Sequence, residues 1–296
     1  MKALENNPID QYLRATLDTE TAIGEQVTWT FPFPSICFSE DDVSWPLIGA
    51  PLVVDEENLN RYSTYSDGND GYFIYKRTEL GSPEPLYQVV ATYIGRRIGV
   101  SIAQSAMMLS RNYQGNFILG KVSHCPSMKM KPLAGNDDIP DVNLLKQLNP
   151  SILTGDGVLR AALRDRDHRW SHVMVGTMTD AIPYTYDHGR SFSNAGNDWD
   201  EKSLLNSSVG SYFWEIRMER QELLSYIHRF IKIPNWEITA ACLAPAFFLQ
   251  RFHIANKTFY LKRASQMASF LIACKKTLEH DVMTYYDGLV RTVSYG

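Results

Sequence analysis

The order of local patterns along the chain constrains its fold most, because short alternating segments come first and helical periodicity comes later. In the first part, a helix is predicted from Ser82 to Gly99, with a serine cap, prolines in its first turn and a terminal glycine. Short strands are predicted on both sides of it, at 51–54, 71–77, Ser105–Leu109 and Phe117–Val122. The pattern favours an α+β fold that begins with a small antiparallel sheet and one helix.

After Lys121 the chain becomes predominantly helical. Segment 121–141 is rich in loop-forming residues, and we interpret it as a linker between two parts of the molecule. Helices are predicted around Leu144–Leu148, over Ser151–Leu163 and at several places after Ser211. Between them, 171–176 and 181–187 alternate like the two strands of a β-hairpin. We therefore expect an N-terminal extension at 1–50, a sheet-containing unit at 51–123 and a helical unit with one hairpin at 124–296.

Two aspartates bracket the predicted hairpin. Asp167 lies five residues before His172, which opens the first strand, and Asp187 directly follows the second strand. A hairpin brings these two positions to the same end, so the carboxylates are expected to converge. Phosphoryl transfer needs one carboxylate to orient or deprotonate the acceptor and a second to hold Mg²⁺ against the phosphates. The alternative is a pair of solvated aspartates at the end of a hairpin.

A lysine and a polar loop in the first part of the chain are candidates for contacting phosphates. Lys76 follows the apolar run 72–75, where strand alternation can direct it away from the core, toward phosphates and an acidic residue of the next helix. Backbone N–H groups of the preceding polar loop, 61–71, could cover phosphates. The candidate residues of this loop are Ser63, Thr64, Ser66 and Gly68, which favour turns but lack a GxGxxG spacing.

These features together resemble the HipA-like protein kinases over about 51–236, and most closely at 186–192, Tyr-Asp-His-Gly-Arg-Ser-Phe. The resemblance implies a bilobal kinase-like fold, with the N-lobe ending at about residue 123 and a mainly helical C-lobe. It further implies that ATP and Mg²⁺ are the cofactors. In the implied roles, Lys76 contacts phosphate, Asp167 is the catalytic base, Asp187 binds the metal and Phe117–Val122 leads into the hinge that contacts adenine.

The chain departs from the family pattern at several positions. The second metal-ligand asparagine is replaced by His172, an imidazole that can bind a metal but suits softer ions than Mg²⁺. The helix glutamate that pairs with the lysine is replaced by Gln88, which is kept as a candidate cofactor-binding residue, and Glu84, one turn earlier, is the alternative partner of the lysine. Asp165 is a second candidate acid beside Asp167. The order of the two residues after Asp167 is also inverted, as His168-Arg169.

Two main functions follow from this pattern. The favoured one is ATP–Mg²⁺-dependent phosphoryl transfer to a Ser or Thr hydroxyl of a protein substrate. The other is a pseudokinase with weak or no catalysis that holds a regulatory protein partner, and Gln88 and His172 favour it. A phosphotransferase acting on a small molecule or a lipid is a third possibility, although no acceptor pocket can be identified.

Charge and cysteine content give the remaining expectations. The formal net charge of −4 provides no electrostatic reason to expect a direct nucleic-acid or membrane surface. No signal peptide is recognisable, and the most apolar stretch, Ile238–Leu249, is too short to span a bilayer and contains Pro245. The sequence therefore predicts a cytoplasmic protein. Its cysteines form no CxxC pair, and we expect reduced thiols at Cys37, Cys125, Cys242 and Cys274.

Overall fold

The computed structural model describes part of the chain. The described residues are 36–37, 53–54, 62–66, 71–78, 82–111, 117–125, 129–135, 137–165, 167, 169–176, 183–189, 191–192, 219–249 and 257–294.

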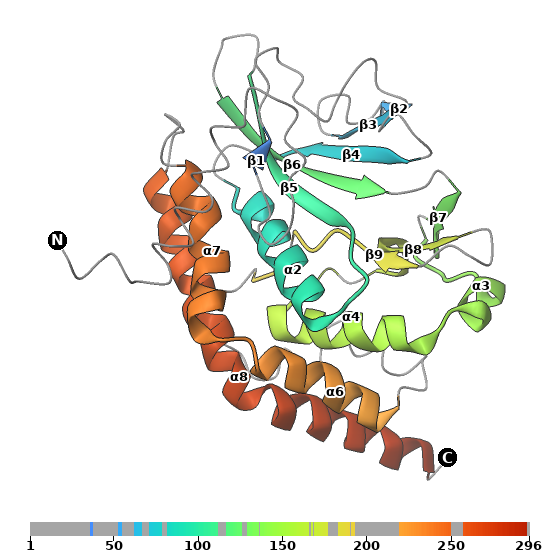
Figure 1. The fold of residues 1–296 in the computed structure, drawn as a ribbon. Coiled ribbons are helices and arrows are strands. Elements are labelled where there is room, and N and C mark those ends of the chain that lie inside the picture. Colours follow the sequence, from blue (N-terminus) through green and yellow to red (C-terminus); the bar gives the residue numbers. More distant parts are fainter. Residues whose placement is uncertain are drawn as a thin grey trace.

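A six-stranded sheet forms the upper layer of the molecule in Figure 1. Its strand order is β1-β5-β6-β4-β3-β2, and every pairing is antiparallel except that of β1 with β5. The predicted strands around 105–109 and 117–122 are both present and longer than expected. The strands are β1 (Ile36–Cys37), β2 (Val53–Val54), β3 (Tyr62–Ser66), β4 (Tyr72–Arg77), β5 (Gln104–Arg111) and β6 (Phe117–Cys125).

Strand β3 corrects the prediction of a polar loop before Lys76. Ser63, Thr64 and Ser66 lie within this strand and are paired with Tyr75, Ile74 and Tyr72 of β4. Aromatic and β-branched residues such as Tyr62, Thr64 and Tyr65 favour an extended strand, and here this preference outweighs that of the serines for turns. The backbone of 62–66 is therefore used in the sheet, and Gly68 lies outside the described residues.

Helix α2 (Glu84–Ile98) packs against β5 and β6 on one face of the six-stranded sheet. It ends where the sequence predicts, because Gly99 adopts a left-handed conformation with a φ of 88° and its N–H caps the last turn. At the other end, the Ser82 hydroxyl accepts a hydrogen bond from the Glu84 N–H at 3.3 Å. Glu84 is the first residue of the helix, and it lies close to the inner strands β4 and β6.

A second, three-stranded sheet with the order β7-β8-β9 lies between the six-stranded sheet and helix α4, Pro150–Leu163 (Figure 1). Strands β8 (Val173–Gly176) and β9 (Tyr184–Thr185) form the expected hairpin, preceded by a 3₁₀ turn at Trp170–His172. The expected linker is only partly a loop. Its first residues extend β6 to Cys125, and Met130–Pro132 form β7, which pairs with β8.

Helices make up the rest of the described chain. Helix α4 confirms the helix predicted over 151–163 and lies between α2 and the pair formed by α6 and α8 (Figure 1). The long helix α8 packs along both α6 and α7. The helices are α3 (Val142–Gln147), α4 (Pro150–Leu163), α6 (Arg220–Ile231), α7 (Asn235–Leu249) and α8 (Lys257–Ser294).

The main apolar core is continuous from the six-stranded sheet to the C-terminal helices. One cluster of buried side chains includes Met107 of β5, Ile94 of α2, Leu159 of α4 and Leu271 of α8. Helix α2 contributes to both sides, because it contacts β5 and β6 as well as α4, α6 and α7. The described chain is therefore a mixed structure of helices and small, mainly antiparallel sheets around a shared core, and a division into two separate lobes is not evident from the core.

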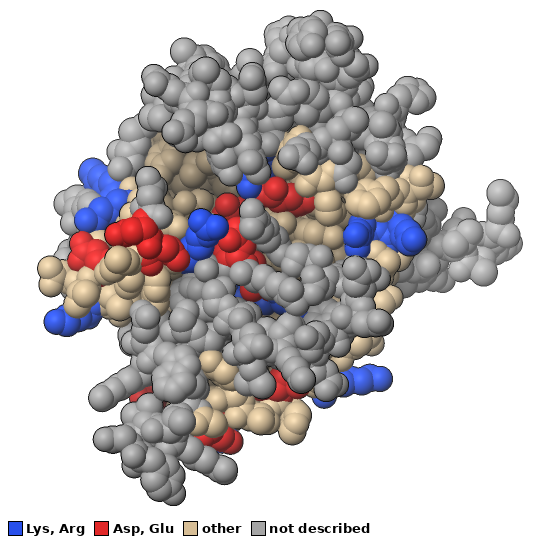
Figure 2. Space-filling view, turned by 180° about the vertical axis from the view of Figure 1, so that it is seen from behind, with Lys and Arg blue, Asp and Glu red and all other residues tan. Residues whose placement is uncertain are grey.

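The described surface carries charges of both signs, in line with the small net charge of the sequence. Among the described residues seen in Figure 2, acidic and basic side chains lie side by side in a band across the middle of that face. Within the described part of the chain, no helix combines the length and apolar character needed to cross a membrane. Cys125, Cys242 and Cys274 are buried free thiols, as expected.

Candidate functional site

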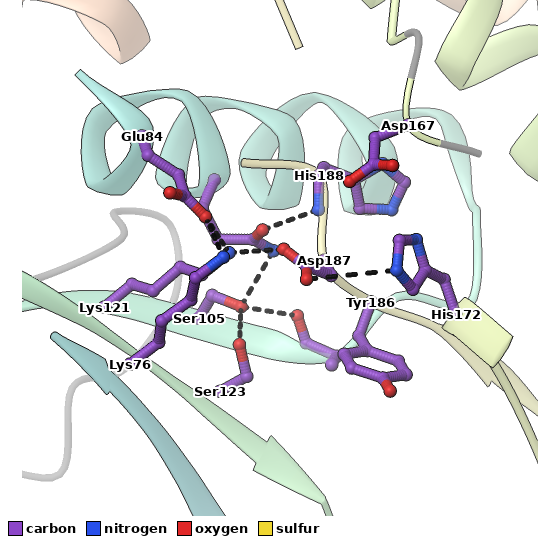
Figure 3. Close-up of polar contacts among 12 residues, drawn as sticks. Lys76, Glu84, Ser105, Lys121, Ser123, Asp167, His172, Tyr186, Asp187 and His188 are labelled. Carbon is purple, nitrogen blue, oxygen red and sulfur yellow. Dashed lines mark hydrogen bonds and ion pairs between the residues drawn. The ribbon is translucent and has the colours of Figure 1, made fainter. Parts of the chain in front are cut away.

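Two lysines and two carboxylates meet beside the six-stranded sheet, and we call them the lysine–carboxylate cluster: Lys76, Lys121, Glu84 and Asp187. Lys76 of β4 and Lys121 of β6 are opposite each other in the strand register, so their side chains leave the same face of the sheet. Glu84 Oε1 lies 2.5 Å from Lys76 Nζ and 2.9 Å from Lys121 Nζ. Figure 3 shows both ammonium groups directed toward Glu84 and Asp187.

Asp187 enters this cluster from the segment that follows β9. Its backbone adopts a left-handed conformation with a φ of 59°, which aspartate tolerates better than most residues. Its Oδ1 accepts a hydrogen bond from Lys121 Nζ. Burial by itself would raise the pKa of Asp187, but Lys121, Lys76 and His172 outweigh this effect and the pKa is strongly lowered. The carboxylate is therefore ionised at neutral pH.

His172 and Asp167 lie on the far side of Asp187 from the lysines (Figure 3). His172 Nε2 is 3.9 Å from Asp187 Oδ2, and the buried Nδ1 has no hydrogen-bond partner among the described residues. Burial lowers the pKa of His172 to about 4, with Asp187 opposing the shift and Arg160 adding to it. Asp167 is near enough to act on the same imidazole, and its carboxylate accepts a hydrogen bond from Arg169 Nε at 3.1 Å. Both predicted aspartates thus act electrostatically on His172, which is neutral at neutral pH.

The structure places Gln88 differently from the expected ligand contact. Its side chain is fully buried, its Oε1 accepts a hydrogen bond from the His188 N–H at 2.6 Å and its Nε2 donates to Ser105 Oγ at 3.2 Å. The ion pair with Lys76 is made by Glu84 instead, because Glu84 is one turn nearer to β4. Gln88 therefore anchors the backbone next to Asp187, and both ends of its side-chain amide are hydrogen-bonded within the protein.

A network of buried charged side chains lies next to the segment that carries Asp187. Arg160 of α4 binds Asp156 Oδ2 at 2.7 Å and Asp165 Oδ2 at 2.6 Å, and all three side chains are fully buried. His188 Nδ1 lies 3.2 Å from Asp165 Oδ2. Burial would raise the pKa of Asp165, but Arg160 and His188 reverse the effect and lower it. Asp165, the second candidate acid, is thus a fully buried carboxylate that is paired within the protein. Its Oδ1 accepts a hydrogen bond from the backbone N–H of Asp167 at 3.1 Å.

Sequence reasoning missed Lys121 and Arg160. Lys121 interrupts the apolar strand Phe-Ile-Leu-Gly-Lys-Val, and a lysine at the centre of a strand that is expected to be buried was an available signal. Arg160 follows Asp156 by four residues inside an otherwise apolar helix, a spacing that places both on one face. Neither signal identifies the partners, which come from distant segments.

A second, smaller apolar cluster with several aromatic side chains adjoins the lysine–carboxylate cluster, between the two sheets. Buried Cys125, Met174 and Tyr184 pack there with the half-buried side chains of Tyr72, Ile74 and Tyr186. Ile74 is two residues from Lys76 on the same strand and Tyr186 precedes Asp187, so this apolar cluster borders the charged groups directly. Flat apolar side chains of this kind suit a planar heteroaromatic ring.

The expected magnesium ligands do not fit Mg²⁺ as they are arranged. Mg²⁺ takes oxygen ligands in octahedral geometry, whereas the two candidates, Asp187 and His172, offer one carboxylate and one imidazole. The carboxylate is in contact with the Lys121 ammonium group. In the described part of the chain, no group of three or more histidine, cysteine or acidic side chains is placed to hold a metal ion.

Comparisons with known proteins give weak structural similarity. No protein-family model and no curated protein matches the chain. Among solved structures, a Helicobacter pylori proinflammatory kinase, CtkA, matches with 10% sequence identity and a TM-score of 0.42, covering 79% of this chain and 100% of the kinase chain. HipA of the Shewanella oneidensis toxin–antitoxin system, solved with HipB and operator DNA, matches with 9% identity and a TM-score of 0.38, covering 92% and 72%. At these TM-scores the structural likeness carries no weight.

Proposed function

We propose that this chain is a kinase-like protein that binds a nucleoside triphosphate at the lysine–carboxylate cluster and transfers its γ-phosphoryl group. The observation that carries the proposal is the Lys76–Glu84 ion pair, which lies beside Asp187 although the three residues come from separate elements. A strand lysine held by a helix glutamate, next to an ionised aspartate, is the arrangement with which kinases orient phosphates. The resemblance of 186–192 to the HipA-like kinases supports the same function.

Each group has a defined part in the proposed reaction. The lysines contact the phosphate oxygens, and the surface formed by Tyr72, Ile74 and Tyr186 receives the base. The acceptor, a Ser or Thr hydroxyl of a protein, forms a new O–P bond to the γ-phosphorus while the bond from this phosphorus to the β–γ bridging oxygen breaks. The nucleoside diphosphate leaves, and Asp167 accepts the proton of the hydroxyl.

Transfer of labelled γ-phosphate tests the proposal. The full chain is incubated with γ-labelled ATP and a mixed protein acceptor, in separate reactions with Mg²⁺, with Mn²⁺ and with EDTA. Asp167→Asn should lower the rate by about a hundredfold or more, the usual contribution of a general base. Asp287→Asn, at an exposed position of α8, is the matched control and should transfer at the wild-type rate. Equal rates for Asp167→Asn and wild type would exclude the role given to Asp167.

A second candidate is a nucleotide-binding protein with weak or no transfer that acts by holding a protein partner. His172 at the position of the expected asparagine and the Lys121 contact to Asp187 favour it. A thermal-shift titration distinguishes the candidates when combined with the transfer assay, because a ligand that binds only the folded chain raises its melting temperature. A shift with ATP or ADP but no transfer under any of the three conditions would support this second function.

A further inference from the structure

Lys121 stands where a divalent cation would have to bind. Its ammonium group donates to Asp187 Oδ1 and also lies 2.9 Å from Glu84 Oε1. The other oxygen, Asp187 Oδ2, faces the His172 imidazole at 3.9 Å. Both carboxylate oxygens that a metal ion would use are therefore next to nitrogen atoms of the protein.

Because both side chains are largely buried, separating Lys121 from Asp187 would cost free energy. The side chain of Lys121 is only 5% exposed and that of Asp187 22% exposed. Moving the ammonium group away from Asp187 would leave a desolvated cation beside an arriving divalent cation, and unpaired buried charges are strongly destabilising. Lys76 and Lys121 already lie next to the two carboxylates, so a metal ion would meet two ammonium groups at close range.

A polyphosphate anion fits the cluster better than a metal ion does. An ammonium group has three N–H donors, and Asp187 and Glu84 account for two directions around Lys121. The remaining donor can bind a phosphate oxygen. Lysine clamps on phosphoryl groups supply the same kind of charge stabilisation as Mg²⁺, and charge-assisted bonds to phosphate are among the strongest in proteins.

We propose that this site binds a nucleoside polyphosphate as the metal-free anion, with Lys121 supplying the positive charge that a divalent cation supplies in other kinase-like sites. The inference rests on the nucleotide binding assigned under the proposed function. It adds that this binding needs no divalent metal ion, and that Asp187 is not required as a metal ligand.

The first test uses the wild-type chain, stripped of metals with EDTA. ADP and ATP are titrated by calorimetry in EDTA and in excess Mg²⁺. We expect binding in EDTA, with a dissociation constant within about threefold of the value measured in Mg²⁺.

Two variants separate the contribution of Lys121 to metal-free binding from that of Asp187. Lys121→Met removes the charge-assisted contact and should weaken binding in EDTA by about tenfold or more. Asp187→Asn should retain or strengthen binding in EDTA, because one negative charge beside the phosphates is lost. Lys276→Met, at an exposed lysine of α8, is the matched control and should bind like the wild type. Circular dichroism and the melting temperature establish that each variant is folded.

Three results would overturn the proposal, and they separate it from the proposed function. Binding that requires Mg²⁺ in the wild type would exclude metal-free binding while leaving the kinase-like function intact. A gain in wild-type affinity on adding Mg²⁺ that is abolished in Asp187→Asn would assign Asp187 to a metal ion. Absence of binding with and without Mg²⁺ would reject nucleotide binding itself, and both proposals with it. The wild-type titration decides the question even if Lys121→Met fails to fold.

Discussion

At Gly189 the backbone passes so close to the lysine–carboxylate cluster that even a methyl group has no room. A Cβ at this position would lie 2.6 Å from Glu84 Oε1 and 2.8 Å from Lys121 Nζ. Gly189→Ala should therefore displace both side chains, lowering the free energy of unfolding by about 1–3 kcal/mol, as overpacking usually does. Urea denaturation measures this loss, and nucleotide titration should show weaker binding.

The control for this prediction is another glycine of the same chain. A Cβ added at Gly288, within α8, meets nothing within 4 Å. Gly288→Ala should stabilise the protein by about 0.5–1 kcal/mol, because alanine favours helix more than glycine does. If Gly189→Ala were as stable as Gly288→Ala and bound nucleotide normally, the packing of Gly189 against Glu84 and Lys121 would be wrong.

The buried imidazole of His172 makes the stability of the fold depend on pH. Its pKa is lowered from 6.5 to about 4 in the folded chain, so the unfolded chain takes up the proton first as the pH falls. Its stabilising contribution is complete above pH 6.5 and declines from there to about pH 4. The loss can reach about 3 kcal/mol.

Urea denaturation between pH 8 and pH 4, in EDTA, measures this effect. His172→Gln should flatten the stability profile in this range, because glutamine carries no proton that titrates there. His228→Gln is the control, since His228 is exposed on α6 and its ion pair with Glu279 lies at the surface. A profile of His172→Gln that remained as steep as that of the wild type would assign the slope to other groups.

At the scale of elements, Arg160 connects α4 to the segment that carries the predicted catalytic residues. Arg160→Met would leave the buried carboxylates of Asp156 and Asp165 without their cation, because its guanidinium binds both. Breaking a buried ion pair on one side typically costs about 3–5 kcal/mol, and we expect a loss of unfolding free energy in this range. Chemical denaturation checks it.

Arg220→Met is the matched control at the surface. Arg220 of α6 lies 3.9 Å from Asp287, and both side chains are about half exposed, so the pair is screened by water. Its loss should change the free energy of unfolding by less than about 1 kcal/mol. Similar losses for both arginine variants would mean that the network around Arg160 contributes no more than a surface ion pair.

The helices were located from the sequence more accurately than the strands. Helical periodicity and capping residues locate α2 and α4 closely, since these signals are local. Strand β3 was mistaken for a loop because serines and a following Asp-Gly favour turns in isolation, while its pairing with β2 and β4 is a tertiary effect. Strand β7 was missed for the same reason, because Met130–Pro132 are extended only where β8 lies beside them.

Part of the lysine–carboxylate cluster was expected from the sequence, and Lys121 was not. Lys76 and Asp187 stand in recognisable sequence contexts, and the structure brings both into one cluster. The partner of Lys76 is Glu84, because the geometry of the first turn of α2 decides between Glu84 and Gln88 and no sequence spacing does so. Lys121 is opposite Lys76 only once β4 and β6 are paired, and that pairing joins residues far apart in the chain.

At the scale of the whole molecule, α2 belongs to the sheet and to the helical part at once. Ile94 is fully buried in the shared core, and its helix contacts β5 and β6 as well as α4, α6 and α7. A cavity at this position should therefore weaken both parts together. We expect Ile94→Ala to lower the free energy of unfolding by about 2–5 kcal/mol, the usual cost of truncating a buried isoleucine.

Hydrogen exchange read by mass spectrometry separates a shared core from two independent lobes. In Ile94→Ala, peptides from β4 to β6 and peptides from α6 to α8 should lose protection to the same extent, because opening of either part exposes α2. Ile139→Ala is the control, since Ile139 is 67% exposed and its truncation should change stability by no more than about 0.5 kcal/mol. If the peptides from α6 to α8 kept wild-type protection while those of the sheet lost it, the two parts would unfold separately, as two lobes with cores of their own.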